Sequence, residues 1–187
     1  MSPDTLDRFV AVSSRLEGVI PWLYLDIRGL VTTGIGCLVD PVGLALDVPF
    51  QIGDRPATQE EIADVWHRVK ASTPLAHLGA KAASKLTALH LPPAGVRQLL
   101  ERRLRANEAY LVKHHFPALL EWPENVQLAI ALIAWACGAG FPASWPSFTA
   151  AALAEDWALA AKHATISTHN NAGIAPRNQA IQELLTC

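Results

Sequence analysis

The sequence predicts an α+β fold that is mainly helical. Apolar residues recur at helical spacing along most of the chain, which is typical of amphipathic helices packed around a core. A short β-rich part near the N-terminus interrupts this pattern, because two runs of β-forming residues flank a turn signal at residues 26–29. A chain of 187 residues is long enough to bury its own core as a single domain.

The N-terminal part is predicted to form one helix followed by a β-hairpin. Apolar spacing predicts a helix over residues 4–16 that ends near Gly18. Residues 19–26 and 30–33 are then the two strands of the hairpin. Pro21 confines the first strand to a sheet edge, because proline donates no backbone hydrogen bond. Candidate caps for the helix are Ser2, Asp4 and Thr5.

The remaining chain is predicted to be irregular at first and helical later. Glycines and prolines keep residues 34–57 irregular or in short strands. Thr58 and Glu61 form a capping box that opens a helix to about Lys70. Residues 71–92 are expected to be a helical or loop insertion without a readable role. Further helices are expected over residues 95–115, 123–137, 148–163 with a break near Glu155, and 177–185.

Composition excludes several classes of function. A net charge of −2 argues against nucleic acid as the main partner. The seven histidines and three cysteines lack the spacing of metal ligands, so no metal and no cofactor is expected. The longest apolar run, residues 128–139, is too short to span a membrane. The N-terminal residues lack the apolar segment of a signal peptide, so we expect a protein made in the cytoplasm.

Three residues near the N-terminus have the chemistry of a glycoside-cleaving site. Glu17 follows the first helix, and apolar neighbours such as Val19 and Trp22 would favour its protonated form, as a general acid requires. Asp26 in the hairpin turn could orient a water molecule or stabilise positive charge on a sugar ring. The hydroxyl of Thr32 could hold the same water molecule in line.

The same residues also have an ordinary structural interpretation. A Glu, Asp, Thr triplet at these spacings arises by chance in roughly a few per cent of chains of this length. Asp26 would then be a turn former and Glu17 a surface charge. Thr33 stands beside Thr32, so the register of the hydroxyl is also open.

Residues 17–36 resemble a motif of the phage-lysozyme family, glycoside hydrolase family twenty-four, which includes endolysins and some bacteriocins. That family's pattern is Glu-Gly, a short gap, and Tyr-x-Asp-x-x-Gly-x-x-Thr-x-Gly-x-Gly. The chain agrees with it at all eight positions, which are Glu17, Gly18, Tyr24, Asp26, Gly29, Thr32, Gly34 and Gly36.

The resemblance implies a muramidase that cleaves peptidoglycan between N-acetylmuramic acid and N-acetylglucosamine. Glu17 would be the acid, and Asp26 with Thr32 would position the attacking water, with inversion at the anomeric carbon. Tyr24, Gly36, Asn171 and Arg177 are expected among the substrate-binding residues. The glycan strands of peptidoglycan would be the partner of this site.

The resemblance also implies a lysozyme-like arrangement of two lobes within one domain, 1–187. A β-rich lobe, residues 17–57, would carry the motif. Residues 1–16 and 58–187 would form a larger helical lobe, with the active-site cleft between the lobes.

A weaker likeness continues toward the C-terminus. Residues 135–138, Trp-Ala-Cys-Gly, replace the family's Phe-Asn-x-Gly, which removes an amide side chain but keeps the glycine. Arg177 is expected to ion-pair with Glu17, as the family's arginine does, or else to cap a helix. Asn170 and Asn171 could bind acetamido or hydroxyl groups, yet asparagines before a glycine are equally good turn formers.

Two other functions and two biological settings remain open at this stage. A lytic transglycosylase cleaves the same bond with one glutamate, so Asp26 and Thr32 would have no purpose there. A non-catalytic peptidoglycan-binding module would not need two carboxylates at one bond. The setting is either a phage endolysin released through a holin-made hole, or an injected antibacterial effector whose maker needs an immunity protein. Both act on periplasmic peptidoglycan.

Overall fold

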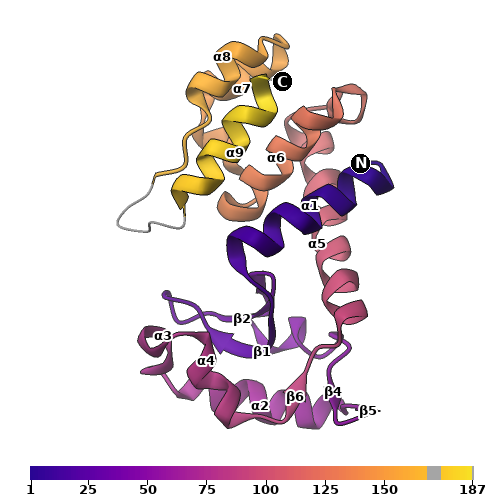
Figure 1. Cartoon of the computed structure of the whole chain (residues 1–187), viewed down its shortest axis with the longest axis vertical. Helices are drawn as coiled ribbons and strands as arrows, with labels where there is room; N and C mark the ends of the chain where they lie inside the picture. The colour runs from indigo at the N-terminus through magenta and orange to yellow at the C-terminus, as the bar shows by residue number, and fades with distance from the viewer. Residues whose placement is uncertain (168–173, 187) are drawn as a thin grey trace. The chain divides into compact units, whose positions relative to one another are not determined.

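The computed structural model describes residues 1–167 and 174–186 as an α+β protein, mainly helical, with two small antiparallel sheets (Figure 1). The fold class predicted from the sequence is confirmed at this level. Backbone contacts divide the chain into two compact units. We call Met1–Glu17 with Arg102–Cys187 the helical unit, and Gly18–Glu101 the hairpin unit.

The helical unit is built around α6, Glu124–Cys137. Residues 126–135 of α6 are all buried, as expected for a helix that is apolar on every side. Helices α1 and α9 pack against α6 and run beside it in Figure 1. The described helices of this unit are α1 (Pro3–Glu17), the later part of α5 (Pro93–His114), η3 (Leu119–Glu121), α6, η4 (Phe141–Ser144), α7 (Pro146–Leu153), α8 (Trp157–His163) and α9 (Ile174–Thr186).

The ends of α1 follow from its sequence. Ser2 precedes the helix, and its hydroxyl accepts a hydrogen bond from the Thr5 amide at 3.2 Å, so Ser2 is the cap among the three candidates. Pro3 occupies the first helical position, where its missing N–H costs nothing. Gly18 adopts a φ of 71° and ends the helix directly after Glu17.

The predicted break near Glu155 is confirmed. Glu155 has a φ of 55° between α7 and α8, a conformation that no helix continues through. Asp156 then caps α8, because its carboxylate accepts a hydrogen bond from the Leu159 amide at 2.9 Å.

The predicted hairpin is also confirmed, within a sheet of order β1-β2-β3. Its strands are β1 (Ile20–Leu25), β2 (Val31–Gly34) and β3 (Cys37–Leu38). Tyr24 faces Thr32 across the antiparallel pair. Pro21 lies in β1, which is an edge strand as predicted, and the register shifts between Ile20 and Tyr24.

The second sheet, of order β5-β4-β6, includes a strand from residues 71–92, which were expected to be helical or a loop. β4 (Gln51–Ile52) pairs with β5 (Arg55–Pro56) and with β6 (Leu89–His90), which lies inside the stretch 71–92. Strands of two residues have no readable periodicity, so only the tertiary structure reveals this pairing.

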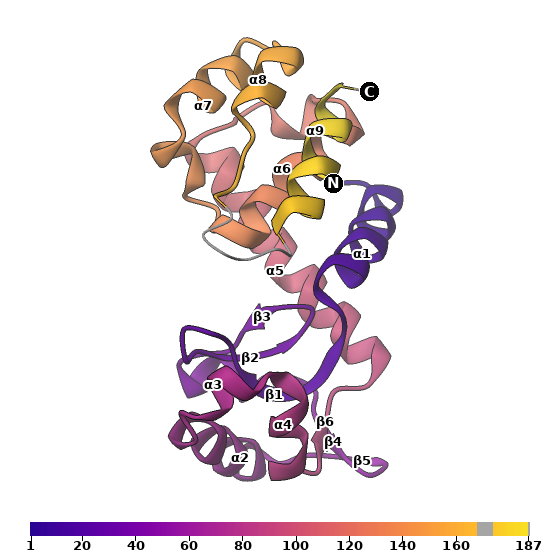
Figure 2. The same ribbon diagram turned by 60° about the vertical axis from the view of Figure 1, so that its left-hand side comes forward.

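Short helices complete the hairpin unit. The capping box at Thr58 and Glu61 is present, and it opens α2, Gln59–Ala71. Figure 2 shows α3 and α4 beside β1 with α2 next to them, and these helices contact β1. The remaining elements are η1 (Val42–Leu44), α3 (Leu75–Leu78), α4 (Ala80–Ala83) and η2 (Ser84–Leu86).

The division into units differs from the expected lobes. The β-rich lobe was expected to end at residue 57, whereas residues 58–101 belong with the hairpin. Trp66 of α2 illustrates the reason, because it is buried and donates from Nε1 to the carbonyl of Val39 at 2.8 Å. Helical spacing reveals an apolar face, but it does not reveal which strands or helices cover that face.

Candidate active site

Glu17 and Arg177 form an ion pair inside the helical unit. Glu17 is the last residue of α1, and Arg177 lies in the first turn of α9. The Arg177 side chain is 2% exposed and that of Glu17 is 36% exposed. Arg177 also donates from Nη1 to the carbonyl of Leu132 in α6 at 3.2 Å. Three helices therefore fix the guanidinium that holds Glu17.

This arrangement refines what was expected of Arg177. Of the two alternatives, the ion pair with Glu17 is the one present. The Arg177 side chain is buried, and its guanidinium donates to Glu17 and to the carbonyl of Leu132.

The apolar neighbours expected for Glu17 belong to the hairpin unit. Val19 is half exposed, and Trp22 donates from Nε1 to the carbonyl of Ala80 at 2.7 Å. Inside the helical unit the immediate neighbour of the Glu17 carboxylate is thus a cation, not an apolar wall.

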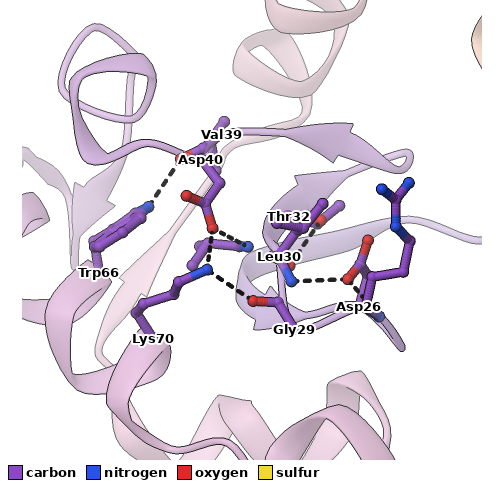
Figure 3. A network of polar contacts seen from close by, with 10 residues as sticks. Asp26, Gly29, Leu30, Thr32, Val39, Asp40, Trp66 and Lys70 are labelled. Carbon is purple, nitrogen blue, oxygen red and sulfur yellow. Dashed lines mark hydrogen bonds and ion pairs between the residues drawn. The ribbon is translucent and has the colours of Figure 1, made fainter. Parts of the chain in front are cut away.

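Asp26 begins the turn between β1 and β2 and folds back on it (Figure 3). Its Oδ1 accepts hydrogen bonds from the amides of Arg28 at 2.9 Å and Leu30 at 2.8 Å. Gly29, with a φ of 73°, donates from its amide to the Asp26 carbonyl at 2.9 Å. The other carboxylate oxygen of Asp26, Oδ2, has no hydrogen-bond partner within residues 1–167 and 174–186. One oxygen therefore orients the carboxylate, and the other is available to a ligand.

The two neighbouring threonines are distinguished by their hydroxyl partners. Thr32 donates from Oγ1 to the carbonyl of Leu30 at 3.2 Å, and the Asp26 amide donates to that same carbonyl at 2.9 Å. Thr33 is fully buried, and its Oγ1 donates to the carbonyl of Ile20 at 3.4 Å. The hydroxyl that shares the surroundings of Asp26 is consequently that of Thr32.

Tyr24 and Gly36 lie on the same sheet. Tyr24 is half-buried and stands directly opposite Thr32, so the two side chains emerge on one face. Gly34 and Gly36 have φ values of 65° and 67° on either side of Ile35. That backbone conformation alone accounts for both glycines.

The C-terminal part of the expected site is only partly described. Asn170 and Asn171 lie outside the described residues. Gly138 ends α6 with a φ of 85°, so the packing role expected for it is present. Cys137 is exposed and free; partial burial raises the pKa of its thiol, while the charge of Arg177 acts in the opposite direction.

An ion pair that the sequence did not suggest braces the Asp26 turn. Lys70 of α2 donates from Nζ to Asp40 at 2.6 Å and to the carbonyl of Gly29 at 2.9 Å (Figure 3). The other partner of Asp40 is the Val31 amide at 3.1 Å. Burial alone would raise the pKa of Asp40, but the hydrogen bonds from Lys70 and Val31 and the charge of Lys70 bring it below its ordinary value.

Comparison with known proteins gives no match from which a function could be transferred. Neither the models of known protein families nor the curated proteins give a match to the chain. Among the described residues no cluster of three or more His, Cys, Asp or Glu could hold a metal ion, and no described helix has the length and apolar character needed to cross a membrane.

Glu17 on the one hand, and Asp26 with Thr32 on the other, are suited to two different chemical steps. A carboxyl group held by a fixed guanidinium, as in Glu17, can transfer a proton in a defined direction. A carboxylate with an open oxygen beside a hydroxyl, as in Asp26 and Thr32, can hold a water molecule and accept its proton.

Proposed function

We propose that this protein is a peptidoglycan hydrolase, an N-acetylmuramidase that cleaves the β-1,4 bond between N-acetylmuramic acid and N-acetylglucosamine. The observation that carries the proposal is the pairing of Asp26 and Thr32 on the Leu30 carbonyl, with Asp26 Oδ2 open, inside a motif that agrees with the phage-lysozyme pattern. A lysozyme-like fold is part of this proposal.

Glu17 acts as the general acid, which requires it to carry a proton in the substrate complex. This proton moves to the glycosidic oxygen as the bond from that oxygen to the anomeric carbon breaks. Glu17 is then left as a carboxylate, and the guanidinium of Arg177 stabilises the negative charge that develops on it. Because Arg177 is already fixed by Leu132, little reorganisation is needed at that moment.

A water molecule attacks the anomeric carbon from the opposite side. Asp26 Oδ2 accepts one proton of this water while the water oxygen bonds to the anomeric carbon. The Thr32 hydroxyl donates a hydrogen bond to the carbonyl of Leu30, so its oxygen is left as an acceptor for the second hydrogen of the water molecule. The product is a reducing muramic acid with inverted configuration, which requires carboxyl groups about 6.5–9.5 Å apart in the substrate complex.

Replacement of Glu17 by glutamine tests the proposal most directly. Glu17→Gln keeps an acceptor for Arg177 but cannot donate an acidic proton, so we expect a loss of about 10²-fold or more in the rate of murein solubilisation. Glu60→Gln, at an exposed position of α2, is the matched control and should be fully active. Circular dichroism and thermal unfolding establish that each variant is folded. Normal lysis by Glu17→Gln would rule the assignment out.

The products distinguish the proposed activity from its alternatives. Mass spectrometry of the released muropeptides should find reducing muramic acid ends, because water is the attacking group. Anhydro-muramic acid ends would instead identify a lytic transglycosylase. Murein left intact by the folded wild type over a wide pH range would identify a binding module.

A further inference from the structure

Two successive peptide groups join Asp26 and Thr32 to the ion pair of Asp40 and Lys70 (Figure 3). The first is the Gly29–Leu30 peptide. Its carbonyl accepts from Lys70 Nζ at 2.9 Å, and its N–H donates to Asp26 Oδ1 at 2.8 Å. Because a trans peptide is planar and its C=O and N–H point in opposite directions, fixing the carbonyl on Lys70 also fixes the N–H that holds Asp26.

The second is the Leu30–Val31 peptide, which has the reverse arrangement. Its N–H donates to Asp40 Oδ2 at 3.1 Å. Its carbonyl accepts from the Asp26 amide at 2.9 Å and from Thr32 Oγ1 at 3.2 Å. The ion pair thus holds one end of each peptide group, and the proposed water-binding residues hold the other end.

Charge adds to this geometry. The Lys70 ammonium withdraws electron density through the peptide group and makes the Leu30 N–H a stronger donor to Asp26. The carboxylate of Asp40 polarises the second peptide group in the same manner, so that the Leu30 carbonyl becomes a stronger acceptor for the Thr32 hydroxyl.

The ion pair is itself held in place by Trp66. The Asp40 side chain is 14% exposed and that of Lys70 is 36% exposed. Lys70 Nζ lies 5.9 Å from the centre of the Trp66 ring, and Trp66 Nε1 donates to the carbonyl of Val39, the residue before Asp40. An ion pair on an open surface contributes little, whereas this one is packed and bonded to backbone groups.

We propose that Asp40 and Lys70 are positioning residues that hold the Asp26 carboxylate and the Thr32 hydroxyl in the orientation needed to bind the attacking water. The catalytic part of this inference rests on the proposed muramidase activity. The order of the turn, however, can be measured without any substrate, so the two proposals can fail separately.

The test compares Lys70→Met with Arg68→Met. Both changes remove a cation from α2, but the Arg68 side chain is exposed and makes no hydrogen bond among the described residues. We expect amide hydrogen exchange at Arg28 and Leu30 to become about tenfold faster in Lys70→Met, since their acceptor Asp26 Oδ1 is then less ordered. Exchange should be unchanged in Arg68→Met.

Kinetics on soluble glycan strands provide the second readout. In Lys70→Met we expect kcat to fall about tenfold with KM nearly unchanged, because a displaced water-binding group affects the chemical step more than binding. Lys70→Arg keeps a cation and should recover most of kcat. If Lys70→Met does not fold, Asp40→Asn carries the same test, because it removes the charge that holds Lys70.

The outcomes separate the two proposals. Unchanged exchange at Arg28 and Leu30 in Lys70→Met would overturn the positioning role, whatever the activity. Faster exchange with an unchanged kcat would also overturn it, because the order of the turn would then not matter for hydrolysis. A folded wild type that cleaves no glycan would overturn the muramidase assignment and leave the measured order of the turn as it stands.

Discussion

Asp26 uses its two carboxylate oxygens differently. Oδ1 accepts two amide hydrogen bonds and makes the turn, as the structural interpretation required. Oδ2 makes no such bond among the described residues and is the atom to which we assign the water. The turn-forming interpretation is therefore confirmed for Oδ1, and the proposed role in binding water falls to Oδ2.

Asp26→Asn separates these two roles. The asparagine carbonyl can keep the bonds of Oδ1 to Arg28 and Leu30, while the amide nitrogen that replaces Oδ2 cannot accept a proton. We expect a melting temperature close to that of the wild type and a fall of about 10²-fold or more in kcat. Asp54→Asn, in the turn between β4 and β5, is the control. Full activity of folded Asp26→Asn would contradict the role given to Oδ2.

At the level of elements, helices and the hairpin were predictable because their signals are local. The capping box at Thr58, the edge strand marked by Pro21 and the break at Glu155 all depend on residues within a few positions of one another. The pairing of β6 with β4 and the bond from Lys70 to the Asp26 turn join distant parts of the sequence. No periodicity records such contacts, so they could not be predicted.

The contact between α2 and the hairpin should make stability depend on pH in a defined direction. The pKa of folded Asp40 lies below its ordinary value of 3.8, so its ionised form favours folding. This contribution is complete above the unfolded pKa and is lost as the pH falls through the folded pKa.

Urea unfolding of the wild type and Asp40→Asn measures this contribution. The difference in free energy of unfolding between them should be largest near about pH 6 and should shrink below about pH 4. The pH-dependent contributions of the other carboxylates are the same in both proteins and cancel in this difference. They include the contribution of Glu61, whose pKa is lowered to about 2 by its hydrogen bond with Arg55. A difference that does not vary with pH would show that Asp40 is not the titrating group.

For the whole molecule, the sequence predicted a mainly helical α+β fold class, but it did not predict how the chain divides into two units. The helical unit is discontinuous, since α1 joins residues 102–187 while residues 18–101 form a unit of their own. Long stretches of helical periodicity on both sides of the boundary at residue 101 look alike in the sequence. The expected lobe boundary at residue 57 therefore followed the end of the β-rich composition and not the contacts.

The proposed substrate lies outside the cytoplasm, which gives a test in living cells. Fusion to a periplasmic leader sequence should cause lysis of the producing cells, whereas the same chain without the leader should leave growth unchanged. The leader fusion carrying Glu17→Gln is the control, because it is exported but should not cleave. Equal toxicity in both compartments, measured by culture turbidity, would point to a target other than peptidoglycan.

The division of the chain between Glu17 and Gly18 has a consequence for the cell that makes the protein. The ribosome completes the hairpin unit, with Asp26 and Thr32, well before it reaches α9. Arg177, the cation that orients the proposed acid, follows Glu17 by 160 residues. A chain interrupted before α9 would thus lack the cation that orients the proposed acid, and the proposed wall-degrading activity would depend on synthesis through Arg177.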